Sequence, residues 1–194
     1  MATLGIERAS LVGHSLGGAI AAQFTLQFPK MVEKLILVNS AGLGKEAAFA
    51  LRLLSLPLIG EMLSRPSRSG TEQSLQLYVH DQASITEEEI DLSYQMAAQP
   101  GRQQALLETV RGVGNLSGQK KSFYEPLCSE LKTIRQPTLV IWGRQDQIVP
   151  VIHAEVAAQS IPDVRVEIFD NCGHVPMLEQ SQAFTRALLE FLQN

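Results

Sequence analysis

The sequence has 194 residues, of which 45% are hydrophobic and 19% are charged, and its formal net charge is −4 at pH 7. This length is sufficient for one sizeable hydrophobic core, and the composition is ordinary for a globular protein. Because the charge balance is acidic, the chain offers no basic surface for nucleic acid, and we expect no nucleic-acid partner.

Cysteine usage and hydropathy indicate where such a chain would reside. Its two cysteines, Cys128 and Cys172, are too few for a disulfide framework, so we expect free thiols in a reducing compartment, the cytoplasm. The first residues lack a basic segment followed by an apolar core and a cleavage site, so we expect no secretion signal in them. The most apolar later stretch, residues 47–63, contains Arg52 and Pro57 and is too short to span a bilayer.

Residues 9–18 predict an apolar strand that runs into a Gly-x-Ser-x-Gly turn, and residues 19–28 predict the amphipathic helix that follows. A serine in this setting lies on a tight, strained turn and projects its hydroxyl from the carboxyl end of a sheet. We expect glycine to be required at positions 13 and 17, because a Cβ on Gly13 or Gly17 would collide with the neighbouring strand or helix. The helix N-terminus behind Ser15 supplies unpaired N–H groups to a developing oxyanion.

The rest of the chain alternates between strand and helix, apart from one long interruption. An all-apolar run at residues 35–38 is typical of a parallel strand buried on both faces, whereas residues 45–134 contain helical patterns and no convincing strand. Strands at 138–143 and 164–169 then alternate with helices around 153–157 and 184–191. This order predicts an α/β fold with a parallel sheet flanked by helices and a helical insertion after the second strand.

A serine nucleophile needs a general base, and that base needs an acid to hold its tautomer. In open α/β sheets these groups lie on loops at the carboxyl ends of strands. The loop at 143–150 offers one carboxylate, Asp146, and the loop at 170–176 offers one imidazole, His174. The order Ser15, Asp146, His174 matches the order expected on such a scaffold.

Several alternatives compete for these roles. We expect His14 to point away from the pocket and to pack or bond locally. Asp170 is the runner-up acid, although it would have to fold back, and Asn39 ends a strand where a carboxylate could serve but lacks the charge. Cys172 is expected to be a small packing residue. The remaining histidines, His80 and His153, are expected to be structural or solvated, and Asp163 lies at the wrong end of its strand.

The four histidines show no metal-ligand spacing, so we expect neither a metal nor another cofactor.

Three separated motifs together resemble the α/β-hydrolase superfamily, most closely its capped esterase and carbon–carbon-bond hydrolase branch. They are residues 13–18 (Gly-His-Ser-Leu-Gly-Gly), residues 142–150 and residues 172–174 with Glu179. The resemblance implies that Ser15 is the nucleophile, His174 the base and Asp146 its partner, with the Leu16 N–H as one oxyanion donor. It also implies a hydrolase core at residues 1–43 and 135–194 and a helical cap at residues 44–134.

In the cap, Leu51, Leu54 and Met62 are expected to line an acyl-binding cleft or to form the core of the cap itself.

The chain departs from this family because several strands normally precede the serine turn, together with a loop that gives the second oxyanion donor. We therefore expect a C-terminal portion of a hydrolase, with residues 10–13 as an unprotected apolar edge strand through which the chain could self-associate. Loss of one oxyanion donor typically lowers turnover by about 10² to 10³.

The leading function is a serine hydrolase that forms an acyl-enzyme from a carboxylic ester or related small acyl substrate. Acyl transfer, cleavage of a carbon–carbon bond next to a ketone, or an inactive fragment that pairs with another chain are the alternatives.

Overall fold

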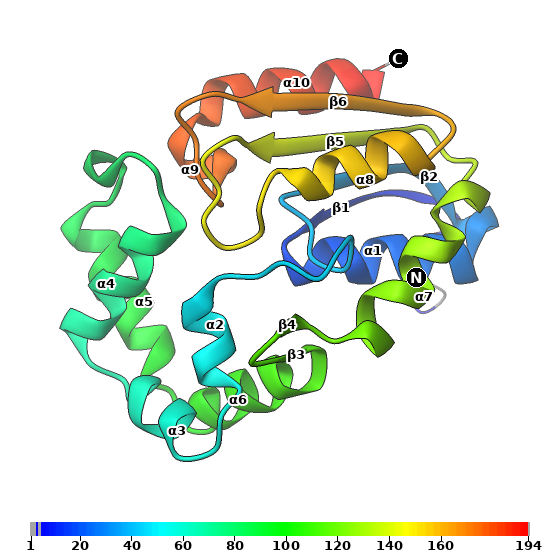
Figure 1. The fold of residues 1–194 in the computed structure, drawn as a ribbon. Helices are drawn as coiled ribbons and strands as arrows, with labels where there is room; N and C mark the ends of the chain where they lie inside the picture. Colours follow the sequence, from blue (N-terminus) through cyan, green and yellow to red (C-terminus); the bar gives the residue numbers. More distant parts are fainter. Residues whose placement is uncertain (1–2, 4, 194) are drawn as a thin grey trace.

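The computed structural model describes residue 3 and residues 5–193, so the outermost residues of the two expected core segments, Met1 and Asn194, lie outside the described residues. A four-stranded parallel sheet with the order β1–β2–β5–β6 crosses the molecule (Figure 1). Its strands are β1 (Ala9–His14), β2 (Val32–Val38), β5 (Thr138–Gly143) and β6 (Val164–Phe169). The expected α/β fold with a parallel sheet is thus confirmed.

Helices cover both faces of this sheet. They are α1 (Leu16–Gln27), α8 (Ile152–Ser160), α9 (Pro176–Glu179) and α10 (Ser181–Gln193). Alternate residues of β2 belong to different hydrophobic clusters: Leu35 and Leu37 pack with α1 and α8, and Ile36 and Val38 pack with α10. All four side chains are fully buried, as the unbroken apolar run predicts.

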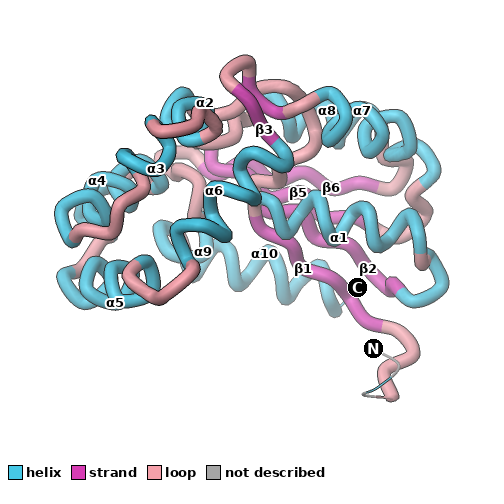
Figure 2. The backbone as a smooth tube through the Cα atoms, turned by 90° about the horizontal axis from the view of Figure 1, so that it is seen from below, coloured by secondary structure: helices cyan, strands magenta, loops and turns pink. Residues whose placement is uncertain are grey.

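The segment between β2 and β5, residues 44–134, is called the helical insert below. It contains α2 (Phe49–Leu54), α3 (Ile59–Leu63), α4 (Arg68–Tyr78), α5 (Glu87–Ala97), α6 (Arg102–Val113) and α7 (Lys121–Glu130). Figures 1 and 2 both show α3, α4 and α5 beyond the carboxyl ends of the strands. These three helices of the insert therefore lie over the end of the sheet where the predicted site residues are placed, whereas α7 packs beside α1.

The expectation of an insert without strands needs one correction. Two-residue strands, β3 (Gly114–Asn115) and β4 (Gly118–Gln119), pair antiparallel within it. Their turn is closed by Asn115, whose side chain accepts a hydrogen bond from the Ser117 N–H, and by Gly118, whose φ is 119°. Strands this short have no alternating apolar pattern, which is why the sequence gives no signal for them.

One edge of the sheet is formed by β1, because the strand order leaves it paired with β2 alone. Val12 on this strand is 51% exposed. The structure thus has the apolar edge that the sequence predicts for this chain. None of the helices within residues 5–193 combines the length and the apolarity that a bilayer crossing requires.

His153 lies on α8 and is buried, so of the two alternatives expected for it the structural one holds. Its side chain is 1% exposed, with the ring 6.3 Å from the Trp142 ring and Nε2 3.1 Å from Glu46 Oε2. The buried Nδ1 has no hydrogen-bond partner among the described residues. Burial lowers the pKa of His153, and the hydrogen bond to Glu46 opposes that shift only in part.

We expect the free energy of unfolding to fall when the pH is lowered from about 7.5 to about 5.5. In the unfolded chain the pKa of histidine is about 6.5. Because His153 and His14 both have lowered pKa values in the fold, the unfolded state binds more protons over this range. Urea titrations of the unchanged chain and of His153→Leu should show a weaker pH dependence in the variant. Equal stability at both pH values would contradict this expectation.

Candidate active site

Ser15 lies at the sharp turn between β1 and α1, with φ 54° and ψ −123°. A side chain other than glycine is strained in this region, and such strain persists only when surrounding contacts enforce it. Here the Ser15 N–H donates to Val38 O at 2.9 Å, while Ser15 O accepts from Ala41 N at 2.9 Å and Gly18 N at 3.0 Å. The Ser15 side chain does not cap the helix. The predicted strained turn is confirmed.

Close approach around this turn explains two glycines, but not both of those expected. A Cβ on Gly13 would lie 2.3 Å from Gly17 O, as predicted. A Cβ on Gly17 would have no atom within 4 Å, so that part of the prediction is wrong. The second steric constraint falls instead on Gly18, where a Cβ would lie 2.3 Å from Ser40 Oγ, because α1 crosses the end of β2 one residue later.

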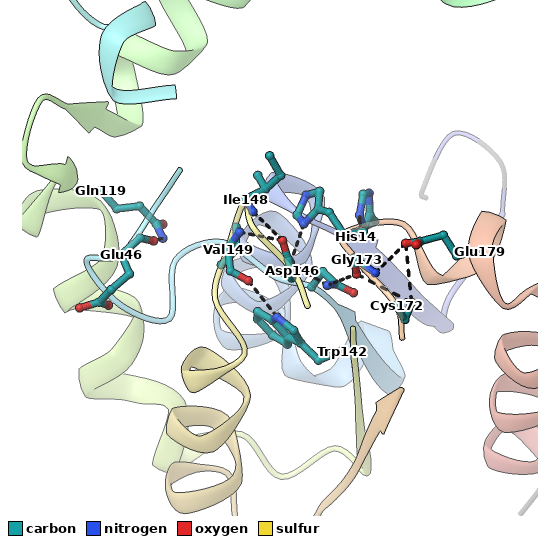
Figure 3. A network of polar contacts seen from close by, with 12 residues as sticks. His14, Glu46, Gln119, Trp142, Asp146, Ile148, Val149, Cys172, Gly173 and Glu179 are labelled. Atoms are coloured by element: carbon teal, nitrogen blue, oxygen red, sulfur yellow. Dashed lines mark hydrogen bonds and ion pairs between the residues drawn. The ribbon is translucent and has the colours of Figure 1, made fainter. Parts of the chain in front are cut away.

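Asp146 and His174 form a buried pair in which His174 Nδ1 lies 2.7 Å from Asp146 Oδ2. The same oxygen accepts from Asn39 Nδ2 at 2.7 Å. Asp146 Oδ1 accepts from the N–H groups of Ile148 at 2.7 Å and Val149 at 3.0 Å (Figure 3). Because an ionised carboxylate only accepts, Nδ1 of the imidazole must carry the proton, which leaves Nε2 as an acceptor.

The two loops that carry this pair touch each other closely. A Cβ on Gly143 would lie 1.9 Å from Gly173 O and 2.5 Å from Cys172 O, so only glycine fits where β5 ends. Trp142 Nε1 donates to Val149 O at 3.0 Å, which fixes the far side of the Asp146 loop. These contacts bring the acid and the imidazole from different loops to one point.

His14 connects the serine turn to the same point. Its Nε2 donates to His174 O at 2.7 Å, and the two rings are 4.7 Å apart. Burial first, and then the neighbouring His174, lower the pKa of His14. The expected local bonding of His14 is thus wrong, because its partner is 160 residues away. Since Ser15 follows His14, the serine and the imidazole lie at the same end of the sheet.

The competing residues occupy other positions. Asp170 forms an exposed ion pair with Arg144. Cys172 is fully buried, and burial with the nearby Glu179 raises its pKa to about 12, so the thiol stays protonated at neutral pH. Of the apolar residues expected in the insert, Leu51 packs against the core cluster, whereas Met62 is 60% exposed. Within the described residues no group of three or more His, Cys, Asp or Glu side chains could hold a metal ion.

A family model described as the α/β hydrolase fold matches residues 1–181. The chain belongs to this family. A 2-hydroxy-6-oxononadienedioate/2-hydroxy-6-oxononatrienedioate hydrolase of Comamonas testosteroni is 35% identical over 201 residues. A 2-hydroxy-6-oxo-6-phenylhexa-2,4-dienoate hydrolase of the same organism is 34% identical over 200 residues. All of this chain aligns with each, but it spans only 66% and 65% of their lengths.

The solved structures that resemble this α/β hydrolase chain also include hydrolases of this kind. A meta-cleavage product hydrolase from Pseudomonas fluorescens superposes with a TM-score of 0.80 at 25% identity, covering 100% of this chain and 67% of that one. The resemblance to the carbon–carbon-bond hydrolase branch, predicted from three motifs, is therefore confirmed.

Sequence reasoning misses the roles of two polar residues at the site of this α/β hydrolase chain. An amide has no charge, so Asn39 is not expected to take part, yet its Nδ2 donates to both Asp146 Oδ2 and Gly173 O. The place of His14 on the turn predicts a side chain that faces away, yet its Nε2 donates to His174 O. The only available signal for Asn39 is its location after β2, at the same end of the sheet as the two loops.

Proposed function

We propose that this chain carries the catalytic unit of a serine hydrolase, with Ser15 as nucleophile, His174 as general base and Asp146 as its orienting acid. The observation that supports this proposal most is the 2.7 Å contact between His174 Nδ1 and Asp146 Oδ2. It lies beside a strained serine turn whose neighbour, His14, also contacts His174.

In the first step, Ser15 Oγ attacks the carbonyl carbon of the substrate, and its proton passes to His174 Nε2. Asp146 stabilises the resulting imidazolium through Nδ1. The carbonyl oxygen becomes an oxyanion, which we assign to the Leu16 N–H at the start of α1, where the first backbone donors have no partner within the helix. Collapse transfers the proton from Nε2 to the leaving group, and water then hydrolyses the acyl-enzyme by the same route.

The names of the relatives favour one substrate class within this chemistry. Both are named as hydrolases of unsaturated 2-hydroxy-6-oxo acids, which carry a ketone at position 6. We therefore favour cleavage of a carbon–carbon bond next to a ketone over hydrolysis of a carboxylic ester. Acyl transfer would use the same three residues. Turnover of 2-hydroxy-6-oxo-6-phenylhexa-2,4-dienoate against an aryl ester separates the first two reactions.

The same proposal assigns different parts of the chain to the catalytic core and to a cap. Residues 1–43 and 135–194 would form the catalytic core, and the helical insert at residues 44–134 would be a cap over the substrate. Support comes from the place of α3, α4 and α5 beyond the carboxyl ends of the strands. The two cysteines are free, which supports the cytoplasm as its location.

The test is covalent labelling with a fluorophosphonate, followed by mass spectrometry of the peptides. We expect one label on Ser15 and none in Ser15→Ala. Ser129→Ala is the matched control and should label like the unchanged chain, because Ser129 is exposed on α7, where its Oγ donates to Pro126 O.

A second candidate function is that of a non-catalytic chain that pairs through β1 with a second copy. The exposed Val12 on this edge strand supports it. Light scattering on the labelled sample distinguishes the two. A dimer that takes no label would favour this second candidate and would overturn the catalytic proposal.

A further inference from the structure

The loop that carries His174 is bonded directly to the helical insert, at the last residue of α4 and the segment that follows it. His174 N–H donates to Tyr78 O at 2.7 Å. The Tyr78 ring also stacks on the His174 ring, with a centroid separation of 5.8 Å and an interplanar angle of 27°. His174 is therefore held at two points: Asp146 bonds its side chain at Nδ1, and the insert bonds its main-chain N–H.

The carboxylate of Glu179, at the end of α9, accepts hydrogen bonds from both the histidine loop and the insert. Its Oε1 accepts from Gly173 N at 2.7 Å, on the histidine loop. Its Oε2 accepts from His80 N at 2.6 Å and from Asp81 N at 3.2 Å, on the insert. Figure 3 shows the Glu179 side chain directed at Gly173. Hydrogen bonds to an ionised acceptor are stronger than neutral ones, so we expect this bridge to add more than the neutral contact between His174 N–H and Tyr78 O.

The backbones on the two sides of the bridge are closely packed. A Cβ on Gly173 would lie 2.7 Å from Tyr78 O and 2.8 Å from His80 N, so the two backbones are in direct contact. Val79, between them, is 5% exposed. A displacement of the insert at this point must therefore pull on the backbone of the histidine loop.

We propose that Glu179 is a positioning residue that couples the seating of the helical insert to the placement of the His174 imidazole. The proposal rests on the proposed function of His174 as general base. When the insert is seated, the Glu179 carboxylate fixes Gly173 and the Tyr78 carbonyl fixes the His174 main chain. When the insert moves away, both restraints on the histidine loop are lost together.

The test compares Glu179→Ala and Glu179→Gln in the full 194-residue chain. Removal of the carboxylate should accelerate hydrogen exchange of the Gly173, His80 and Asp81 amides by about tenfold or more, because all three lose their acceptor. It should also slow fluorophosphonate labelling of Ser15 by about 10- to 100-fold, since small displacements of a catalytic group have effects of that size. Glu179→Gln keeps one acceptor oxygen and should recover part of both losses.

Glu155→Gln is the matched control, because it removes the same charge from an exposed position on α8 and should change neither readout. Faster exchange with an unchanged labelling rate would reduce Glu179 to a structural contact and overturn the proposal. Unchanged exchange in Glu179→Ala would overturn the bridge itself. Failure of the unchanged chain to label would instead overturn the proposed function, because amide exchange reports on the bridge without any chemistry at Ser15.

Discussion

Asp146→Asn should reduce the labelling rate of Ser15 about 10⁴-fold while the chain still folds. The carboxylate of Asp146 accepts four hydrogen bonds, two at each oxygen. An asparagine that keeps its oxygen toward the Ile148 and Val149 amides presents its NH₂ to His174. The imidazole must then accept at Nδ1 and carry its proton on Nε2, where it cannot take the proton of Ser15.

The matched control is Asp170→Asn, on the loop that carries His174. Asp170 is exposed and pairs with Arg144, so its replacement should change the labelling rate by less than about threefold. Labelling rates of both variants, with circular dichroism to verify folding, check this expectation. If Asp170→Asn proves the more damaging change, the acid has been assigned to the wrong loop.

Gly143→Ala should lower the free energy of unfolding by about 3 kcal/mol or more, at the upper end of the range for overpacked positions. The added methyl carbon would lie 1.9 Å from Gly173 O and 2.5 Å from Cys172 O. Both are backbone atoms, which cannot rotate away as a side chain would. Relief of the clash requires a shift of the loop that holds His174, so labelling of Ser15 should fall as well.

Gly112→Ala provides the comparison for this substitution. Gly112 lies within α6, and a Cβ there would meet no atom within 4 Å. We expect a gain of about 0.5–1 kcal/mol, because alanine restricts the unfolded chain and favours helix. Urea unfolding followed by the fluorescence of Trp142, the single tryptophan, measures both variants. A Gly143→Ala chain as stable as the unchanged one would contradict the described approach of the two loops.

Local patterns were sufficient for much of the fold. The serine turn depends on neighbouring residues, and its strained φ and ψ follow from a strand that runs directly into a helix. The unbroken apolar run of β2 predicts burial on both faces, and alternation of strand and helix predicts the parallel sheet. Asp146 and His174 were paired from their loops alone, because parallel strands end at one edge of a sheet.

Contacts between distant segments explain what sequence reasoning missed. The bond from His14 to His174 spans 160 residues, and that from Glu179 to His80 spans 99. Neither side chain has a local pattern that identifies its partner. The steric role expected of Gly17 belongs to Gly18, because it depends on how α1 crosses the end of β2 beside Ser40. Such details are set by packing, which periodicity and motif spacing do not encode.

A crystal structure of the chain after phosphonylation tests the central claim most directly. We predict an adduct on Ser15 Oγ, with His174 Nε2 within hydrogen-bond reach of an adduct oxygen, about 2.6–3.2 Å, and with His174 Nδ1 still bonded to Asp146. An adduct on another residue, or an imidazole turned away from Ser15, would contradict the proposal that these three side chains act as one unit.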